Sequence, residues 1–204
     1  MTDLSVIRFI AITDNVRDGQ SGLISRAVAA ANGGATSIQL RLKDVSARDL
    51  VTLARELVRS VGVPVIVNDR ADVAIAAGAA GVHLGADDIP ASAVRAFAPE
   101  GFIIGASVGN DDEVRRSRGA DYVGIGPIFS TQSKKDAGTA IGVAELTRLA
   151  AAAGLPAVAI GGITAANARA AIDAGAAGIA AIASVMGAED PGAAAVELAS
   201  AIGT

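Results

Sequence analysis

The sequence contains no cysteine, which excludes disulfide bonds, thiolate catalysis and cysteine-bound metal sites. Histidine is almost as scarce. His83 is the only one, so a histidine-rich metal site or a histidine-dependent triad is poorly supported. Aromatic residues make up only 2% of the chain. The core must therefore be built from Val, Ile, Leu and Ala, which is typical of helices packed closely on a buried parallel sheet.

Long apolar runs and blocks of basic residues are also missing. No run reaches the ~20 residues of a membrane-spanning helix, and the start, MTDLSVIRF, lacks the basic and apolar segments of a secretory signal. With the lack of cysteine, this favours the cytoplasm. The net charge of −4 comes without a basic block, which argues against nucleic-acid binding as the main role. We expect small-molecule partners.

Short β-branched runs alternate with longer Ala-rich segments throughout the 204 residues. Strands alternating with helices imply parallel pairing, and eight such units predict a closed (β/α)₈ TIM barrel that forms one domain over residues 1–204. An open doubly wound sheet is the alternative, but no Gly-x-Gly-x-x-Gly follows the first strand. The predicted strands are 6–12, 37–40, 64–67, 81–84, 102–107, 122–126, 156–160 and 177–182, with clear helices at 47–61 and 142–153.

Several residues mark the expected ends of helices. Thr164 and Asp190 are predicted N-caps, the second with Pro191 at the first helical position. Gly62 and Gly154 stand where helices commonly end on a glycine.

Polar residues follow the predicted strands, and the carboxyl ends of barrel strands form the mouth where active sites lie. Asp69 and Asp88 follow neighbouring strands and offer the oxygen ligands of Mg²⁺, which takes one or two carboxylates beside waters and phosphates. Asp87 is more simply explained by solvation or capping. Arg41, Lys43 and Lys134 are cations suited to a polyphosphate. Together these residues predict a site for magnesium and a polyphosphate.

The segments IGGIT, at 160–164, and IAS, at 182–184, lead into predicted helices in the last quarter of the barrel. Backbone N–H groups at such places bind phosphate in many barrels, although a Gly-Gly pair alone also fits a tight turn. His83 lies inside a predicted strand, and we expect a packed side chain that points away from the mouth.

Six segments occur in one order over most of the chain: IQLRLK, VNDRADVA, GVHLGADDIP, GAS, ADYVGIGPIFSTQSKKDAG and AIGGIT. This series resembles the thiamine phosphate synthase family. The resemblance implies a (β/α)₈ barrel that joins hydroxymethylpyrimidine diphosphate to thiazole phosphate, giving thiamine phosphate and pyrophosphate, with Mg²⁺ as cofactor. It also suggests a possible homodimer.

The resemblance also implies roles for individual residues. Asp69 and Asp88 would bind Mg²⁺, and the pyrimidine diphosphate would be held by Gln39, Arg41, Lys43, Asn68, Ser107 and Lys134. Of these, Arg41, Lys43, Ser107 and Lys134 are the expected catalytic residues of a dissociative, magnesium-assisted reaction. Thr131 and Ser133 would contact the thiazole, and its phosphate would lie at Gly162, Ile182 and Ala183.

The sequence departs from the family pattern at several positions. Ala86 stands where Gln is usual, Ser130 replaces a proline, and Ser133 replaces a threonine. Gly109 stands where a histidine often follows strand five, and Ala183 where serine is frequent. Ala86 and Gly109 each remove a hydrogen-bonding side chain near the site, which bears on activity and on the choice of substrate.

Two other functions are compatible with this barrel. One is an isomerase of the related thiazole tautomerase type, which lacks the paired aspartates and uses a histidine in the loop after strand five. The other is a non-catalytic barrel that binds a phosphorylated ligand. The presence of both Asp69 and Asp88, and the absence of that histidine, favour the synthase.

Overall fold

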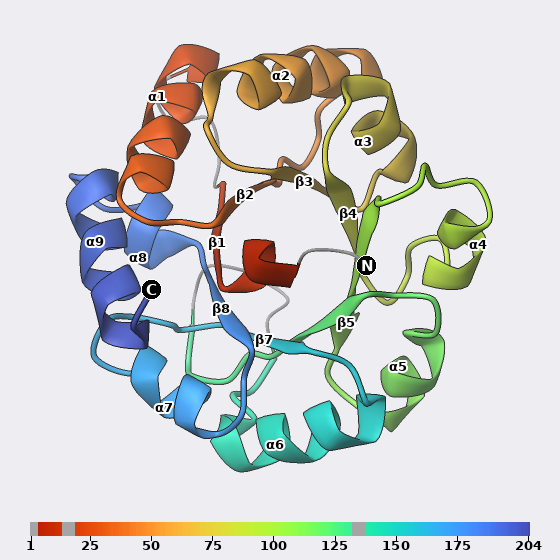
Figure 1. Ribbon diagram of the computed structural model, residues 1–204, viewed down its shortest axis with the longest axis vertical. Coiled ribbons are helices and arrows are strands. Elements are labelled where there is room, and N and C mark those ends of the chain that lie inside the picture. Colours follow the sequence, from red (N-terminus) through yellow and green to blue (C-terminus); the bar gives the residue numbers. More distant parts are fainter. Residues whose placement is uncertain (1–3, 14–18, 132–137) are drawn as a thin grey trace.

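The chain forms a closed barrel of eight parallel strands surrounded by helices (Figure 1). The computed structural model describes residues 4–13, 19–131 and 138–204. Strands pair in sequence order, and the last closes on the first, which confirms the predicted (β/α)₈ fold. They are β1 (Phe9–Ile12), β2 (Ser37–Leu40), β3 (Val65–Asn68), β4 (Gly81–Leu84), β5 (Ile103–Val108), β6 (Tyr122–Ile125), β7 (Ala157–Ile160) and β8 (Gly178–Ala181).

Helices follow the strands and cover the outside of the barrel (Figure 1). None that the structure describes is long and apolar enough to cross a membrane. They are α1 (Gly19–Asn32), α2 (Ala47–Ser60), α3 (Ala71–Ala77), α4 (Ala91–Arg95), α5 (Asp111–Arg116), α6 (Gly142–Ala153), α7 (Ala168–Asp173), α8 (Ala183–Met186) and α9 (Pro191–Ile202).

Helix caps follow the sequence in part. Asp190 caps α9, its side chain accepting the N–H of Ala193, and Pro191 begins the helix. Gly154 ends α6 in the left-handed conformation, at φ 62°, as predicted. The predictions for Thr164 and Gly62 are wrong.

Both errors have a local cause. The cap residue of α7 is Asn167, because the chain first makes a turn in which the Thr164 carbonyl accepts the N–H of Asn167. Helix α2 ends on Val61 in an extended conformation. Its chain therefore continues towards β3 without the left-handed residue that Gly62 would have supplied.

The strands are buried on both faces. Ile10 and Ile12 pack with side chains inside the barrel, whereas Phe9 and Ala11 pack in the larger cluster between the strands and the helices. Successive strand residues point to opposite faces, so every second residue of each strand faces the interior. The interior is filled largely by aliphatic side chains, together with the ring of Tyr122.

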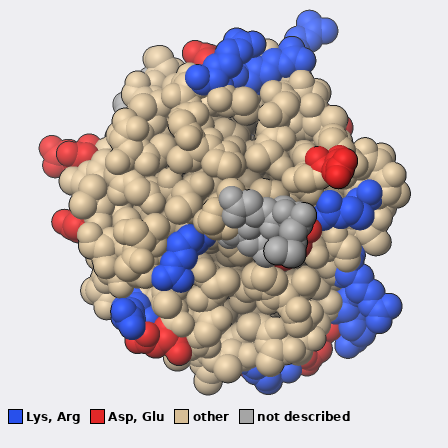
Figure 2. Space-filling model, viewed as in Figure 1, with Lys and Arg blue, Asp and Glu red and all other residues tan. Residues whose placement is uncertain are grey.

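The amino-terminal end of the barrel is closed by a short 3₁₀ helix, η1 (Leu4–Ile7). The predicted strand 6–12 is wrong in its first part, because Val6 and Ile7 belong to η1 and pack inside the barrel. The Val6 carbonyl accepts hydrogen bonds from the hydroxyls of Thr36 and Ser37, which ties η1 to the start of β2. Figure 2 views this face, where charged side chains lie mostly towards the edge.

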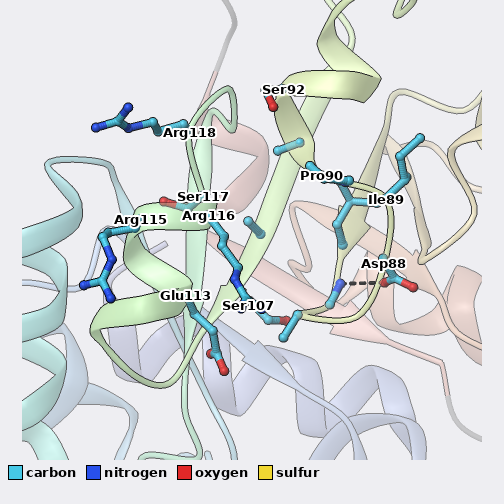
Figure 3. A pocket seen from close by; sticks show the side chains of 15 residues that line it. Asp88, Ile89, Pro90, Ser92, Ser107, Glu113, Arg115, Arg116, Ser117 and Arg118 are labelled. Atoms are coloured by element: carbon cyan, nitrogen blue, oxygen red, sulfur yellow. Dashed lines mark hydrogen bonds between the residues drawn. The ribbon is translucent and has the colours of Figure 1, made fainter.

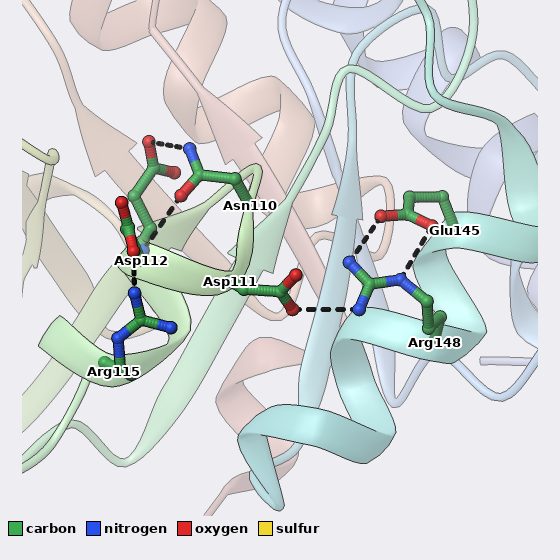
Figure 4. A network of polar contacts seen from close by, with 7 residues as sticks. Asn110, Asp111, Asp112, Arg115, Glu145 and Arg148 are labelled. Carbon is green, nitrogen blue, oxygen red and sulfur yellow. Dashed lines mark hydrogen bonds and ion pairs between the residues drawn. The ribbon is translucent and has the colours of Figure 1, made fainter.

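An ion-pair network joins α5 to α6 on the outside of the barrel (Figure 4). Arg148 contacts Asp111 at 2.8 Å and Glu145 at 2.7 Å. The hydrogen bonds from Arg148 hold the pKa values of both carboxyls below their usual range. The network is open to solvent, so it stabilises the packing of these helices only modestly.

Candidate functional site

The predicted site residues gather at the carboxyl end of the barrel. Parallel pairing around a closed ring brings the end of every strand to one mouth. Asn68 ends β3 and Ser107 is the next-to-last residue of β5, while Gln39 lies in β2 and is almost wholly buried. Loops that are far apart in sequence therefore meet around one opening.

The carboxylates of Asp69 and Asp88 face each other across the ends of β3 and β4. Burial, followed by the charge of Asp88 and a hydrogen bond with it, raises the pKa of Asp69 from 3.8 to about 6, against opposing effects of Asn68 and Arg41. The Asp69 backbone has φ 65°, and its N–H donates to the His83 carbonyl at 2.8 Å. Asp88 is fixed by the Gly85 N–H, which donates to its Oδ2 atom at 2.6 Å.

This pair has the chemistry of a site for a hard cation. Two facing carboxylates that repel each other are stabilised when a divalent ion lies between them. The described residues contain no group of three or more His, Asp or Glu side chains placed to hold a metal. A pair of carboxylates suits an ion such as Mg²⁺, which takes one or two carboxylates and keeps several waters or substrate oxygens. Asp87 is exposed and stands outside the pair.

Arg41 is held by a residue that the sequence did not single out. The buried Thr13 hydroxyl accepts a hydrogen bond from the backbone N–H of Arg41 at 2.8 Å and donates one to the backbone carbonyl of Arg41 at 3.1 Å. Arg41 lies near enough to Asp69 to lower the pKa of that carboxyl. Thr13 is the first residue after β1. A polar residue directly after a predicted strand is the signal by which the sequence could have placed Thr13 at the mouth. Lys43, two residues beyond Arg41, is exposed.

Part of the predicted site lies outside the described residues. Ser133 and Lys134 fall in the segment 132–137, whereas Thr131 is described and is half-buried. The loop after β6, which carries Thr131, is hydrogen-bonded to the end of β7. The N–H of Ile128 donates to the Ile160 carbonyl at 2.9 Å, and that of Phe129 donates to the Gly161 carbonyl at 3.0 Å.

The loops after β7 and β8 lie side by side. Gly162 has φ 67°, and a Cβ atom there would stand 2.5 Å from the Ser130 carbonyl oxygen, so only glycine fits. The Ser184 hydroxyl donates to the Ile163 carbonyl at 2.7 Å, which ties α8 to the Gly162 loop. Ile182 is buried, and the exposed Ala183 begins α8, where backbone N–H groups lack helical partners.

His83 lies differently from the expectation. It is packed, but its ring points into the barrel, where Nε2 lies 3.1 Å from the Ser107 hydroxyl and Nδ1 lies 3.0 Å from that of Tyr122. The prediction that it points away from the mouth is wrong, because alternation along β4 places it on the interior face with its neighbour Gly81.

A cavity of about 230 Å³ opens beside the mouth, between α4 and α5 (Figure 3). Asp88 and Ser107 line it together with Glu113 and Arg116. Glu113 was not expected at the site, and its Oε2 atom accepts the N–H of Gly109 at 2.6 Å. A Cβ atom on Gly109 would lie 3.4 Å from this oxygen, which is an ordinary contact. The missing side chain at Gly109 thus leaves room beside the mouth.

Comparisons with known proteins show the family of this chain. The model of the family described as thiamine monophosphate synthase matches residues 9–185. The chain is 54% identical over 138 residues to the thiamine-phosphate synthase of Methanoculleus marisnigri, covering 65% of each chain. It is 49% identical over 156 residues to that of Roseiflexus castenholzii, covering 74% of this chain and 68% of the relative. The match thus spans about two thirds of these relatives' lengths, just under that share for the first.

Solved structures resemble the whole barrel. Thiamine phosphate pyrophosphorylase from Pyrococcus furiosus superposes with a TM-score of 0.84 at 36% identity, covering 97% of this chain and 96% of that one. A 3-hexulose-6-phosphate synthase superposes with a TM-score of 0.76 at 21% identity, covering 96% of this chain and 99% of the other. The second likeness concerns the fold alone.

Proposed function

The chain belongs to the thiamine monophosphate synthase family, and from that premise we propose that it condenses hydroxymethylpyrimidine diphosphate with thiazole phosphate. The products are thiamine phosphate and pyrophosphate. The observation that carries the proposal is the facing pair Asp69 and Asp88 beside Arg41 at the barrel mouth. A monophosphate isomerase needs no such arrangement of paired carboxylates and a cation.

The diphosphate of the pyrimidine substrate lies between the ends of β2 and β5. The guanidinium of Arg41, whose backbone Thr13 fixes, donates to its oxygens. Lys43 and Lys134 supply further positive charge. Gln39, Asn68 and Ser107 donate or accept hydrogen bonds around the pyrimidine and its diphosphate.

Asp69 and Asp88 hold Mg²⁺ in this proposal. The raised pKa of Asp69 supports the fit, because burial and the nearby Asp88 carboxylate both make its negative charge unfavourable unless a cation offsets it. When bound, Mg²⁺ neutralises charge on the diphosphate oxygens.

The thiazole phosphate lies on the opposite side of the mouth. Gly162 and the backbone at Ile182 and Ala183 provide N–H groups for its phosphate, in loops that the Ser184 hydrogen bond holds together. Thr131 and Ser133 contact the thiazole ring. The reaction requires the ring nitrogen to face the methylene carbon of the pyrimidine.

The reaction is dissociative. The bond between the pyrimidine methylene carbon and the diphosphate oxygen breaks, and its electron pair leaves with pyrophosphate. Arg41, Lys43, Ser107 and Lys134 stabilise the growing negative charge. The electron-rich aminopyrimidine delocalises the positive charge, and the lone pair of the thiazole nitrogen then forms the new C–N bond. The protein supplies charge stabilisation and positioning, without an obligatory general base.

One incubation tests the proposal. The purified chain is given both substrates with and without Mg²⁺, and pyrophosphate and thiamine phosphate are measured together. We expect equal amounts of both products, formed only when the metal is present. Isomerisation of thiazole phosphate without metal would indicate a tautomerase, and ligand binding without any product would indicate a non-catalytic barrel. The predicted homodimer and cytoplasmic location stay predictions.

A further inference from the structure

Three side chains form a hydrogen-bonded row inside the barrel, on three neighbouring strands. The Tyr122 hydroxyl lies 3.0 Å from Nδ1 of His83, and Nε2 of His83 lies 3.1 Å from the Ser107 hydroxyl. Tyr122 is wholly buried in β6, whereas Ser107 reaches the mouth and lines the cavity of Figure 3. The row therefore runs from the closed interior to the site.

Two glycines make room for this row. Gly105 of β5 pairs with His83 on one side and with Tyr122 on the other. A Cβ atom at Gly105 would stand 2.2 Å from Tyr122 Cζ and 2.5 Å from His83 Nδ1, and one at Gly124 would stand 2.9 Å from His83 Cε1. Real Cβ atoms do not make such contacts, so the two rings occupy space that any other residue would fill.

The direction of the hydrogen bonds follows from Tyr122. Among the described residues, His83 is the only partner of its buried hydroxyl. A buried O–H that cannot donate is costly, and burial raises the pKa of Tyr122 so that it keeps its proton. Tyr122 therefore donates to Nδ1 of His83. A neutral imidazole that accepts at Nδ1 carries its proton on Nε2, so His83 in turn donates to the Ser107 oxygen.

We propose that Tyr122 and His83 are positioning residues that orient the Ser107 hydroxyl as a hydrogen-bond donor towards the mouth. With its oxygen accepting from His83, Ser107 has its own proton left for a ligand. A donor in this place favours an anionic oxygen, such as that of a diphosphate, over an amino group. The assignment deepens the proposed function and rests on it, because there Ser107 contacts the pyrimidine diphosphate.

The protonation state of His83 can be observed directly, because the chain has one histidine and one tyrosine. In protein labelled with ¹⁵N-histidine, proton–nitrogen correlation spectra report a single imidazole. We expect the tautomer protonated at Nε2, with an Nδ1 signal that shifts in Tyr122→Phe, where the donor is lost. A proton on Nδ1 in the native protein would overturn the assignment. This measurement needs no turnover, so it stands apart from any failure of the proposed activity.

Kinetics tests the link to Ser107. His83→Met fills the space without a donor, and His83→Gln keeps an N–H near the Nε2 position. We expect His83→Met and Ser107→Ala each to lower the single-turnover rate by about 10- to 100-fold, because each removes the equivalent of one hydrogen bond to a charged group. His83→Gln should keep most of the native rate.

The double variant of His83→Met and Ser107→Ala provides the control. We expect it to be no slower than Ser107→Ala alone, because His83 acts through Ser107. Additive losses, or equal rates for the Met and Gln variants when all of them fold, would contradict the proposal.

Discussion

Replacing Asp69 by asparagine should stabilise the metal-free protein while it removes the metal site. The substitution suits the backbone, because Asp69 has φ 65° and asparagine tolerates the left-handed region. The amide also keeps the ability to hydrogen-bond with Asp88. What the change removes is the negative charge that burial and Asp88 make unfavourable.

The size of this effect follows from the pKa of Asp69. Its rise from 3.8 to about 6 corresponds to at most about 3 kcal/mol, at ~1.4 kcal/mol for each pKa unit. The side chain lies at a mouth that is open to water, so screening reduces the expected penalty to about 1–2 kcal/mol.

The pH dependence has a definite sign. The folded protein binds the Asp69 proton more tightly than the unfolded chain does, so ionising this group costs stability. The penalty is absent below pH 3.8, grows as the pH rises, and is complete above about 6. The contribution of this group to stability should therefore fall across that range in the native protein and stay constant in Asp69→Asn.

Thermal unfolding measures the difference. At neutral pH without metal, Asp69→Asn should unfold roughly 2–8 °C higher than the native protein, given ~2–4 °C for each kcal/mol in a chain of this size. Added Mg²⁺ should raise the unfolding temperature of the native protein, because it binds the folded state, and should do little for Asp69→Asn. Asp87→Asn is the control and should behave like the native protein. If Asp69→Asn is no more stable than this control at neutral pH, burial and Asp88 do not make the negative charge of Asp69 unfavourable.

Other changes test the proposed chemistry and one structural contact. Asp88→Asn should lower turnover and raise the Mg²⁺ requirement with the fold preserved, and equal effects in Asp87→Asn, measured by magnesium titration of the rate, would undo the assignment. Lys134→Ala should slow steady-state turnover by about 10²-fold, the scale of losing one charge-stabilising group. An electron-withdrawing group on the pyrimidine should sharply slow single turnover, and an unchanged rate with chemistry limiting would exclude the dissociative route. Arg148→Met should destabilise the protein slightly near neutral pH, and the difference, followed by unfolding at several pH values, should vanish in acid as Asp111 becomes protonated.

The sequence by itself determined the architecture and the contents of the mouth. Eight alternating strand-like and Ala-rich segments, without a Gly-x-Gly-x-x-Gly after the first strand, favoured a closed parallel barrel over an open sheet. The position of polar residues directly after strands placed Asp69 and Asp88 at its opening. Local signals also sufficed for the start of α9, since Asp190 and Pro191 act on their own helix. Ordered motifs predicted the family, which the comparisons confirm. The individual roles of the site residues stay predictions.

Only the tertiary structure decided which side chains meet. Strands buried on both faces show no alternation of polar and apolar residues, so the sequence could not tell whether His83 faced the interior or the helices. Its contacts with Tyr122 and Ser107 depend on the register of three strands and on the space left by Gly105. The raised pKa of Asp69 likewise requires the Asp88 carboxylate at close range. Such properties arise between residues distant in sequence, because closing the barrel sets their separation and local pattern does not.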